Sequence, residues 1–261
     1  MNKSIKQLFS INNRVALVTG GSSGIGRTIA YSLAEAGAAV VHVALASEEE
    51  ALRDAVKDVE RDGGKAAYLT CDVSNMDALA EMAVKSASFF GTPHILVNAA
   101  GINLRQPWNE ITSESWDKQL DINLKAAFFL ARHLIPGMQK SGWGKIINIA
   151  SLQSERAFPN SVPYGASKGG IMQLTRAMAE AWSAKESGIT CNAIGPGFFE
   201  TGLTSGLYGQ KDVIMALARQ TIIGRNGELD DLKGVAIFLA SPASDYITGQ
   251  TIYLDGGWTA K

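Results

Sequence analysis

The sequence predicts a single α/β domain with a doubly wound parallel sheet covered by helices on both faces. Two observations predict this fold class. Short apolar runs alternate along the chain with longer stretches of helical periodicity, and strands that are apolar at every position are typical of a buried parallel sheet. The 261 residues suffice for one large domain, and the sequence contains no linker, repeat or low-complexity segment. We therefore expect one domain over residues 1–261.

Each expected element rests on its local pattern, in chain order. Continuous apolar runs predict buried strands at 14–19, 39–45, 66–71, 94–98, 145–150, 190–194 and 251–254. Helical periodicity between these runs predicts helices at 25–36, 48–62, 77–90, 113–140, 164–185 and 230–240. Pro136 is expected to perturb the end of the longest helix because proline lacks an amide donor. Residues 195–225 lack a strand pattern and are rich in Gly and Thr, so we interpret them as a mobile substrate flap.

Composition excludes several classes of function. The formal net charge is −1 and no Lys/Arg run occurs, which argues against a nucleic-acid partner. No run of 18 apolar residues occurs, so no membrane span is expected. Residues 1–13 lack the apolar core of a signal peptide. Cys71 and Cys191 lie in apolar segments and are interpreted as buried thiols of a reducing compartment. These observations predict a cytoplasmic protein.

A glycine-rich turn joins the first predicted strand to the first helix. The segment TGGSSGIGR contains Gly20, Gly24 and Gly26 in the spacing G-x-x-x-G-x-G. Glycines permit a tight turn and close backbone approach, and the N-terminus of the following helix attracts a pyrophosphate. A plain loop is the alternative interpretation, but the position directly after the first strand favours a dinucleotide site. Its expected cofactor contacts also include Ser22, Ser23 and Ile25.

The end of the second strand bears on the choice of dinucleotide. An acidic residue there would bind the ribose 2′-hydroxyl of NAD, whereas an arginine would accept the 2′-phosphate of NADP. The sequence VALAS at 43–47 contains neither. Ser23 offers no positive charge, and the carboxylates at 48–50 would repel a phosphate if they face the site. The sequence therefore favours NAD, with NADP possible.

Tyr164 and Lys168 occur four residues apart in the segment YGASK. Positions i and i+4 lie on one face of a helix, so the ammonium is placed where it can favour the phenolate. Because free tyrosine titrates near ~10, a lowered pKa would make it a usable acid and base. The alternative interpretation is a surface pair on an amphipathic helix. The surrounding motifs decide against that alternative.

The ordered motifs resemble those of the short-chain dehydrogenases/reductases. They are TGGSSGIG at 19–26, the pair at 72–73, NAAG at 98–101, Asn123, Ser151, YGASK at 164–168, PG at 196–197 and DGG at 255–257. The similarity covers the chain from about Leu8 to its end and supports a Rossmann-like fold. One departure is Ala99, where the family has a second asparagine in NNAG. We expect only a lost side-chain hydrogen bond there.

The resemblance implies a catalytic tetrad of Asn123, Ser151, Tyr164 and Lys168. By this resemblance, Ser151 hydrogen-bonds the substrate oxygen and Tyr164 exchanges its proton. Lys168 lowers the pKa of the tyrosine and holds the nicotinamide ribose, and Asn123 holds a water that links Lys168 to solvent. Taken alone, Ser151 could be a strand-end turn residue and Asn123 a helix kink. Further implied cofactor contacts, in addition to Tyr164 and Lys168, are Asp72, Val73, Asn98, Ala99, Ala100, Gly101, Pro196, Gly197, Phe199 and Thr201.

The expected substrate is a sugar or sugar acid. Four segments bear on the substrate: AGINLRQPW at 100–108, NIASLQSERAF at 148–158, GPGFFET at 195–201 and ASDYITGQTIYLDGGWTAK at 243–261. In these segments the chain most resembles the gluconate 5-dehydrogenases and the related 2-deoxy-gluconate 3-dehydrogenases of the family. Arg105 suits a substrate carboxylate and Gln153 suits hydroxyl groups, whereas Arg156 lies on the loop before the tyrosine. For both arginines a solvated loop charge is the alternative interpretation. Phe198, with Phe199 and Trp258, is expected to form an apolar wall or lid. Packing between subunits is the alternative interpretation of Trp258.

Three functions stay open at this point. The first is an NAD(P)-dependent sugar or sugar-acid dehydrogenase acting on a secondary alcohol. The second is a 3-oxoacyl-thioester or broad carbonyl reductase, and the third is a binding or regulatory protein that keeps the fold without catalysis. The resemblance also implies a homotetramer with paired helices. The three histidines have no ligand spacing, so no metal is expected.

Overall fold

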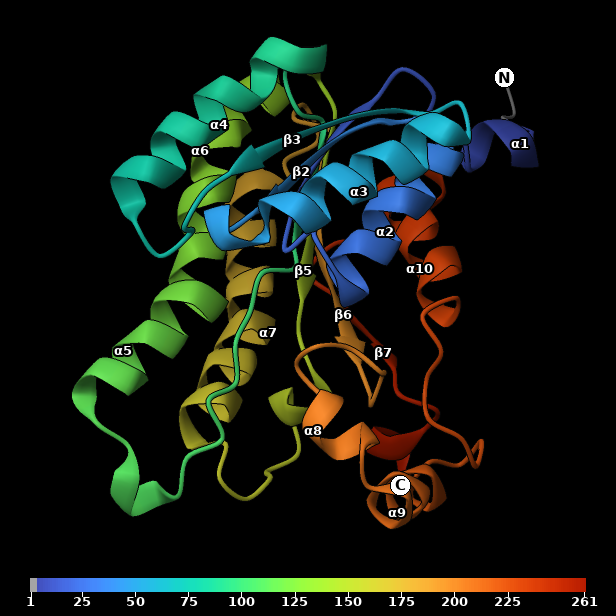
Figure 1. The fold of residues 1–261 in the computed structure, drawn as a ribbon. Helices are drawn as coiled ribbons and strands as arrows, with labels where there is room; N and C mark the ends of the chain where they lie inside the picture. Colours follow the sequence, from blue (N-terminus) through green and yellow to red (C-terminus); the bar gives the residue numbers. More distant parts are fainter. Residues whose placement is uncertain (1–3) are drawn as a thin grey trace.

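The computed structural model describes residues 4–261, apart from the side chain of Leu207, so the first three residues of the expected domain lie outside it. One sheet of seven parallel strands forms the centre of the molecule, in the order β3-β2-β1-β4-β5-β6-β7 (Figure 1). The strands are β1 (Val15–Thr19), β2 (Ala39–Ala44), β3 (Lys65–Thr70), β4 (Ile95–Asn98), β5 (Gly144–Ile149), β6 (Ile189–Pro196) and β7 (Thr251–Leu254). The predicted doubly wound parallel sheet is confirmed.

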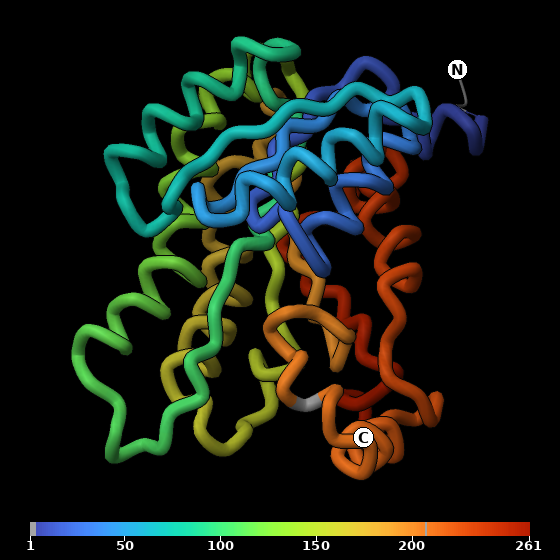
Figure 2. Tube along the Cα trace, viewed as in Figure 1, coloured from blue at the N-terminus to red at the C-terminus, as the bar shows by residue number. Residues whose placement is uncertain are grey.

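Helices cover both faces of this sheet, as the tube in Figure 2 also shows. The helices are α1 (Ile5–Leu8), α2 (Gly24–Glu35), α3 (Glu49–Arg61), α4 (Met76–Phe90), α5 (Ser113–Leu120), α6 (Ala126–Ser141), α7 (Val162–Trp182), α8 (Ser205–Tyr208), α9 (Lys211–Gln220) and α10 (Asp231–Ala240). One apolar core lies between the sheet and α4, α6 and α7, and a second lies between the sheet and α2, α3 and α10. None of the helices within residues 4–261 is long and apolar enough to cross a membrane.

Strand β1 shows why the strands are apolar throughout. Ala16 and Val18 belong to the core on the α2 side, whereas Leu17 belongs to the core on the α6 side. All three side chains are fully buried. Because successive residues of a strand point to opposite faces, a sheet covered on both sides needs an apolar residue at every position.

The order of the strands determines where a ligand can bind. β1 pairs with β2 on one side and with β4 on the other. The connection after β1 leads to one half of the sheet, and the chain later crosses to the other half at β4. In open α/β sheets, a crevice forms outside the carboxyl ends of the strands at such a reversal. The carboxyl ends of β1 and β4 therefore mark the expected ligand site.

Most predicted boundaries differ from the structure by a single residue, but the long helix at 113–140 is divided. A π-helical turn at Asp121–Lys125 separates α5 from α6. Pro136 does not end α6, which continues to Ser141. Proline removes only one hydrogen bond, and residues such as Leu134, Ile135 and Met138 bury the same helix against the core. The helix that carries Tyr164 begins at Val162 and ends at Trp182, before the predicted limit.

The predicted flap at 195–225 is more ordered in secondary structure than its sequence indicated. β6 runs on to Pro196, and Phe199 forms an isolated parallel bridge with Gly227. Two helices, α8 and α9, follow in the segment. α9 contains no buried residue, so packing against the core does not explain its sequence pattern. This is the physical reason why the helix was missed.

Candidate active site

The glycine-rich turn follows β1 and leads into α2. Gly20 adopts a φ of +66°, and a Cβ atom there would lie 2.9 Å from the backbone of Ala99 and Ala100. At Gly26, a Cβ atom would lie 2.1 Å from the carbonyl oxygen of Gly20. The two glycines therefore let the turn pack directly on the segment after β4 and on the first turn of α2. The side chain of the N-cap residue Ser23 caps no amide of α2, which leaves the first amides of this helix for a ligand.

A cavity of about 420 Å³ opens at this turn, a size typical of a small-molecule site. Gly20, Ser22, Ser23, Gly24, Ile25 and Gly26 line it, together with Asp72, Val73, Ala99, Ala100, Gly101, Tyr164, Lys168 and Thr201. The predicted cofactor residues from five separate stretches of sequence thus surround one space. A helix N-terminus at one end and a buried tyrosine at the other fit a dinucleotide, with its pyrophosphate at the helix.

Four other predicted cofactor residues do not line this cavity. They are Asn98, Pro196, Gly197 and Phe199. The amide of Gly197 donates to the backbone oxygen of Leu254 (2.9 Å), and Phe199 is 2% exposed. Gly197 and Phe199 instead line a separate cavity of about 140 Å³, while Pro196 ends β6.

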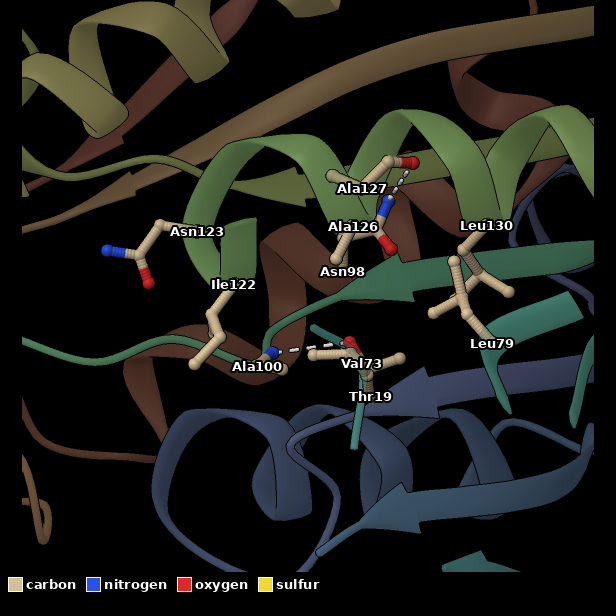
Figure 3. Close-up of a pocket in the computed structure, with 10 residues that line it drawn as sticks. All are labelled: Thr19, Val73, Leu79, Asn98, Ala100, Ile122, Asn123, Ala126, Ala127 and Leu130. Atoms are coloured by element: carbon tan, nitrogen blue, oxygen red, sulfur yellow. Dashed lines mark hydrogen bonds between the residues drawn. The ribbon is translucent and has the colours of Figure 1, made fainter. Parts of the chain in front are cut away.

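The side chain of Asn98 points into the core toward α6 (Figure 3). Its Nδ2 donates to Asn148 Oδ1 (2.8 Å) and to the backbone oxygen of Ala127 (3.4 Å). Asn148 Nδ2 in turn donates to Thr175 Oγ1 (2.9 Å). Asn98 thus ties β4 to β5 and α7, and only its backbone continues toward the cavity.

Thr19 was not predicted as a site residue, although it is the first residue of the motif TGGSSGIG at 19–26. Its hydroxyl accepts hydrogen bonds from the amides of Ala99 and Ala100, both at 3.2 Å, and donates to the backbone oxygen of Val97 (3.4 Å). The bond to Ala100 is drawn in Figure 3. Thr19 therefore fixes the position of the segment after β4, and the threonine before the glycines was the available signal.

Tyr164 and Lys168 both lie in the wall of the large cavity, one turn apart on α7. They are 8% and 5% exposed. Lys168 Nζ lies 5.7 Å from the centroid of the phenol ring and donates to the backbone oxygen of Ile149 (2.7 Å). The predicted juxtaposition is confirmed, because the two side chains share one face of the helix and one cavity.

The net pKa shift of Tyr164 is opposite to the expected lowering, and Lys168 is not among its causes. Burial raises the pKa of Tyr164 above its ordinary value near 10, and the Ser151 hydroxyl and the Arg105 charge only partly oppose this rise. Burial also lowers the pKa of Lys168 to about 8. Desolvation disfavours the charged form of each side chain, and it is the largest cause of both pKa shifts. The groups that favour the phenolate are Ser151 and Arg105.

Ser151 follows the end of β5 and is 8% exposed. Its Oγ accepts a hydrogen bond from the amide of Gln153 (3.1 Å). The same hydroxyl interacts with the phenol of Tyr164. Ser151 therefore lies beside the tyrosine, as the resemblance implied.

Asn123 lies in the π-helical turn and is almost wholly buried. Its Oδ1 accepts from the amide of Ile102 (2.8 Å), while its Nδ2 donates to the backbone oxygen of Ile102 (2.9 Å) and to Ser167 Oγ (3.1 Å). The side chain thus joins the loop after β4 to α7 near Lys168. π-helical turns often occur at functional sites, and a helical pattern alone did not reveal this one.

Four residues were predicted to bind the substrate in addition to Ser151 and Tyr164. Arg105 adopts a φ of +48°, which is uncommon for a residue with a side chain, and its charge reaches the phenol of Tyr164. Gln153 has a buried Oε1 without a hydrogen-bond partner. Arg156 donates to the backbone oxygens of Thr259 and Lys261, so it joins the loop before α7 to the residues after β7.

Phe198 belongs to a cluster of three aromatic rings with Phe158 and Trp258. The ring centroids lie 5.4 to 6.0 Å apart. The three rings come from the loop after β5, the segment after β6 and the residues after β7. They form an apolar contact between three segments that follow carboxyl ends of strands, in which Phe158 is present and the expected Phe199 is not.

Two carboxylates and one ammonium are the charged groups of the large cavity: Glu48, Asp72 and Lys168. Of the acidic residues at 48–50, only Glu48 lines it. Asp72 Oδ1 accepts from the amide (2.9 Å) and the hydroxyl (2.7 Å) of Ser74, which fixes the turn after β3. Within residues 4–261 no three His, Cys, Asp or Glu side chains are grouped so that they could hold a metal.

Comparisons with known proteins agree with this geometry. The family model described as enoyl-(acyl carrier protein) reductase matches residues 20–259. Gluconate 5-dehydrogenase of Gluconobacter oxydans (strain 621H) is 40% identical over 258 residues, covering 97% of this chain and 98% of the relative. 2-Dehydro-3-deoxy-D-gluconate 5-dehydrogenase of Dickeya dadantii (strain 3937) is 37% identical over 258 residues, covering 98% and 100%.

A solved structure gives the same result. The gluconate 5-dehydrogenase from Burkholderia cenocepacia J2315, in complex with NADP and tartrate, matches with a TM-score of 0.92 at 38% identity. The match covers 99% of this chain and 100% of that one.

Proposed function

Because the chain belongs to the short-chain dehydrogenase/reductase family, we propose that it interconverts a secondary alcohol and a carbonyl of a sugar acid. The observation that carries this proposal is the burial of Tyr164 and Lys168 together in one wall of the cavity that begins at the glycine-rich turn. A nicotinamide dinucleotide bound there would accept or donate the hydride. The protein then has to bind the substrate oxygen and move one proton.

Tyr164 is the proposed acid and base. Its hydroxyl gives a proton to the substrate oxygen during reduction and takes it back during oxidation. The Ser151 hydroxyl and the Arg105 charge both favour the ionised phenol, so they stabilise the side chain when it has lost its proton. Ser151 also offers a hydrogen bond to the reacting oxygen.

Lys168 and Asn123 are proposed to support this step. An ammonium has three donors, and one of them is held by the backbone oxygen of Ile149. The others suit the hydroxyls of a nicotinamide ribose. Asn123 holds the loop at Ile102 against α7 and is the proposed end of a water path to Lys168.

The substrate class rests on the relatives and on three features of the site. The relatives named above act on gluconate or on a 2-dehydro-3-deoxy-gluconate. Arg105 supplies a cation close to the tyrosine, which suits a carboxylate, and Gln153 offers an unpartnered acceptor for a substrate hydroxyl. The aromatic cluster around Phe198 would close one side of the site, with residues 195–225 as the flap.

Turnover measured by NADH or NADPH absorbance tests this proposal. We expect oxidation of gluconate, 2-deoxy-gluconate or a related sugar acid, and weaker oxidation of the matched neutral aldoses. Turnover of no sugar or sugar acid in either direction would contradict it. The matching family model is described as an acyl-carrier reductase, which favours a second candidate, a 3-oxoacyl-thioester or broad carbonyl reductase. Reduction of an acetoacetyl thioester without any reaction on sugar acids would establish that candidate.

The proposal also includes a homotetramer in the cytoplasm. Both cysteines are free and buried, which suits a reducing compartment. The tetramer rests on the family resemblance, in which paired helices, here α5 with α6 and α7, form the dimer contact. Light scattering on the purified protein measures the mass, and a monomer would exclude this part.

A further inference from the structure

Strand β2 contains one polar side chain, His42, among the apolar residues that suit a buried sheet. His42 is fully buried. Its backbone pairs with Val18 of β1 on one side and with Tyr68 of β3 on the other, so it lies inside the sheet and not at an edge. Burying a polar group costs stability unless the group is hydrogen-bonded. A histidine at this position therefore needs a reason other than packing.

The imidazole of His42 is bonded to the glycine-rich turn. Its Nδ1 lies 2.9 Å from the backbone oxygen of Gly21. Because a carbonyl oxygen only accepts hydrogen bonds, Nδ1 must carry the proton and donate it. Nε2 is buried and has no hydrogen-bond partner among residues 4–261. Burial lowers the pKa of His42 below its ordinary value of 6.5, while the bond to Gly21 opposes this shift and Arg27 adds to it. The ring is therefore neutral, with its proton on Nδ1.

Gly21 is turned toward β2 and away from the large cavity. Its amide donates to the backbone oxygen of Val43 (3.0 Å), and its carbonyl accepts from His42. A Cβ atom at Gly21 would lie 3.1 Å from both Cβ and Nδ1 of His42, so glycine lets the turn approach the ring closely. Its neighbours Gly20 and Ser22 line the cavity, whereas Gly21 does not. β2 thus holds the turn at a residue that faces away from the ligand.

The bond to His42 also determines the direction of the next amide. In a planar trans peptide, the C=O and N–H groups point in opposite directions. Because the carbonyl of Gly21 points to His42, the amide of Ser22 points away from the ring. Ser22 lines the cavity, and its amide donates no hydrogen bond within the described part of the chain. This N–H is therefore available to an anionic group of a ligand.

We propose that His42 is a positioning residue of the dinucleotide site, whose Nδ1–H holds the peptide between Gly21 and Ser22 so that the Ser22 amide faces the diphosphate. This inference rests on the proposed function, because it assigns a role within the same site. Without the imidazole donor, the buried carbonyl of Gly21 loses its partner. Rotation of the peptide would then turn this oxygen toward the cavity. A carbonyl oxygen repels a diphosphate, whereas an amide attracts it.

The test compares His42→Leu, which removes the donor, with His42→Asn, which keeps a donor nitrogen on Cγ. The dissociation constants of NADH and of NADPH are measured by nucleotide fluorescence on the purified chain without substrate. Both should rise at least about tenfold in His42→Leu, the size expected for a lost hydrogen bond to a charged group. In His42→Asn they should stay within about threefold of the parent, since the amide nitrogen replaces Nδ1. Affinity for adenosine, measured by competition, should stay unchanged in both variants because adenosine has no phosphate.

His94→Leu is the matched control. Nδ1 of His94 also binds a backbone group, accepting from the amide of Val15 (3.2 Å), but Val15 begins β1 at the end of the sheet opposite to the glycine-rich turn. This variant may lose stability, yet its affinity for both dinucleotides should equal that of the parent. A weakening equal to that of His42→Leu would overturn the inference, because the loss would then follow from any damage to the sheet.

Nitrogen NMR of the parent chain tests the same contact without a variant. We expect the proton of His42 on Nδ1, with and without NADH. A proton on Nε2 would overturn the inference, and so would parental affinity in His42→Leu or a loss in His42→Asn as large as in His42→Leu. Failure of the parent to bind either dinucleotide would contradict the proposed function and this inference with it.

Discussion

The two ends of the large cavity are built in different ways. At the dinucleotide end, all five residues of β1 are buried or nearly so, and backbone atoms of the glycine-rich turn and of the segment after β4 lie in direct contact. At the substrate end, Tyr164 and Lys168 of α7 and the loop residues 201–203 line the cavity. Loops and short helices outside this lining are more exposed: Trp108 is 80% exposed, Ile222 and Ile223 are two-thirds exposed, and α9 buries no residue.

This difference explains which part of the site can vary. The dinucleotide end is shaped by backbone, so its geometry depends on a few glycines and on the sheet below them. The substrate end is shaped by side chains on segments that contribute little to the core. A substitution there changes what binds, whereas a substitution at the dinucleotide end changes whether anything binds. Each of the following changes tests this division.

Replacing Tyr164 by phenylalanine should have the largest effect. The variant keeps the ring but loses the proton that general acid and base catalysis requires, so kcat should fall ~10²- to 10⁴-fold. The dissociation constant of the dinucleotide should stay close to that of the parent, since the hydroxyl belongs to the chemical step. Steady-state kinetics and calorimetry on one preparation measure both. If dinucleotide affinity fell by the same factor as kcat, the dinucleotide end and the substrate end of the cavity would not act independently.

Lys168 should make the free energy of unfolding depend on pH. Its pKa is lowered to about 8 in the folded chain from an ordinary 10.5, so between these values the unfolded state binds the extra proton. The stability of the dinucleotide-free protein should then rise across this window, by about 3 kcal/mol if the whole shift is expressed. Denaturant unfolding of the parent and of Lys168→Met, subtracted at each pH, isolates the effect.

Below pH 8, both states carry the charge and the difference between the two proteins should be constant. The raised pKa of Tyr164 acts in the opposite sense, because stability is lost as pH rises past 10. Measurements should therefore end near pH 9.5, where about 2 kcal/mol of the rise should be expressed. If the free energy of unfolding varied with pH in the same way for the parent and for Lys168→Met, Lys168 would not be desolvated as the structure indicates.

Gly26→Ala should damage the dinucleotide end directly. The new methyl group would lie 2.1 Å from the carbonyl oxygen of Gly20, so the turn must open. We expect a loss of roughly 1–3 kcal/mol in the free energy of unfolding and weaker dinucleotide binding. Gly234→Ala is the matched control, because that glycine lies within α10 with nothing within 4 Å of the added atom. The control should stabilise the chain by up to ~1 kcal/mol.

Met215→Ala on α9 should have the smallest effect. The side chain is 43% exposed and the helix buries no residue. Surface substitutions of this kind usually change stability by less than about 0.5 kcal/mol. Thermal unfolding of the parent and the variant measures the change. A loss of more than ~2 kcal/mol in the free energy of unfolding would mean that the substrate end contributes to the core. The difference between the two ends of the site would then not hold.

The sequence predicted the sheet because the strands are apolar at every position and alternate with helices. It also placed Tyr164 and Lys168 on one face, since that relation depends only on helical periodicity. Helical periodicity could not predict the direction in which the pKa of Tyr164 shifts. It depends on how deeply the phenol is buried, and burial comes from packing among segments far apart in the chain.

The same reason explains several contacts of single residues that the sequence did not predict. Asn98 belongs to the NAAG motif, which predicts a ligand contact. Its side chain instead donates a hydrogen bond to Asn148, fifty residues later. Thr19 was treated as the end of a strand, although its hydroxyl holds two amides of another loop. Arg156 reaches the residues after β7. Each of these contacts joins residues at least fifty positions apart, which a local pattern does not encode.

The buried amides inside the sheet have a practical consequence for engineering. Asn98, Asn148 and Thr175 form a chain of hydrogen bonds that spans β4, β5 and α7. A shift in the register of either strand would leave a buried amide without a hydrogen-bond partner in an apolar interior. The hydrogen bonds therefore fix these segments relative to one another. Libraries that keep residues 99–101 and Ser151 and randomise the rest of the loops after β4 and β5 can therefore search for new substrates while these hydrogen bonds hold the two strands and α7 in place.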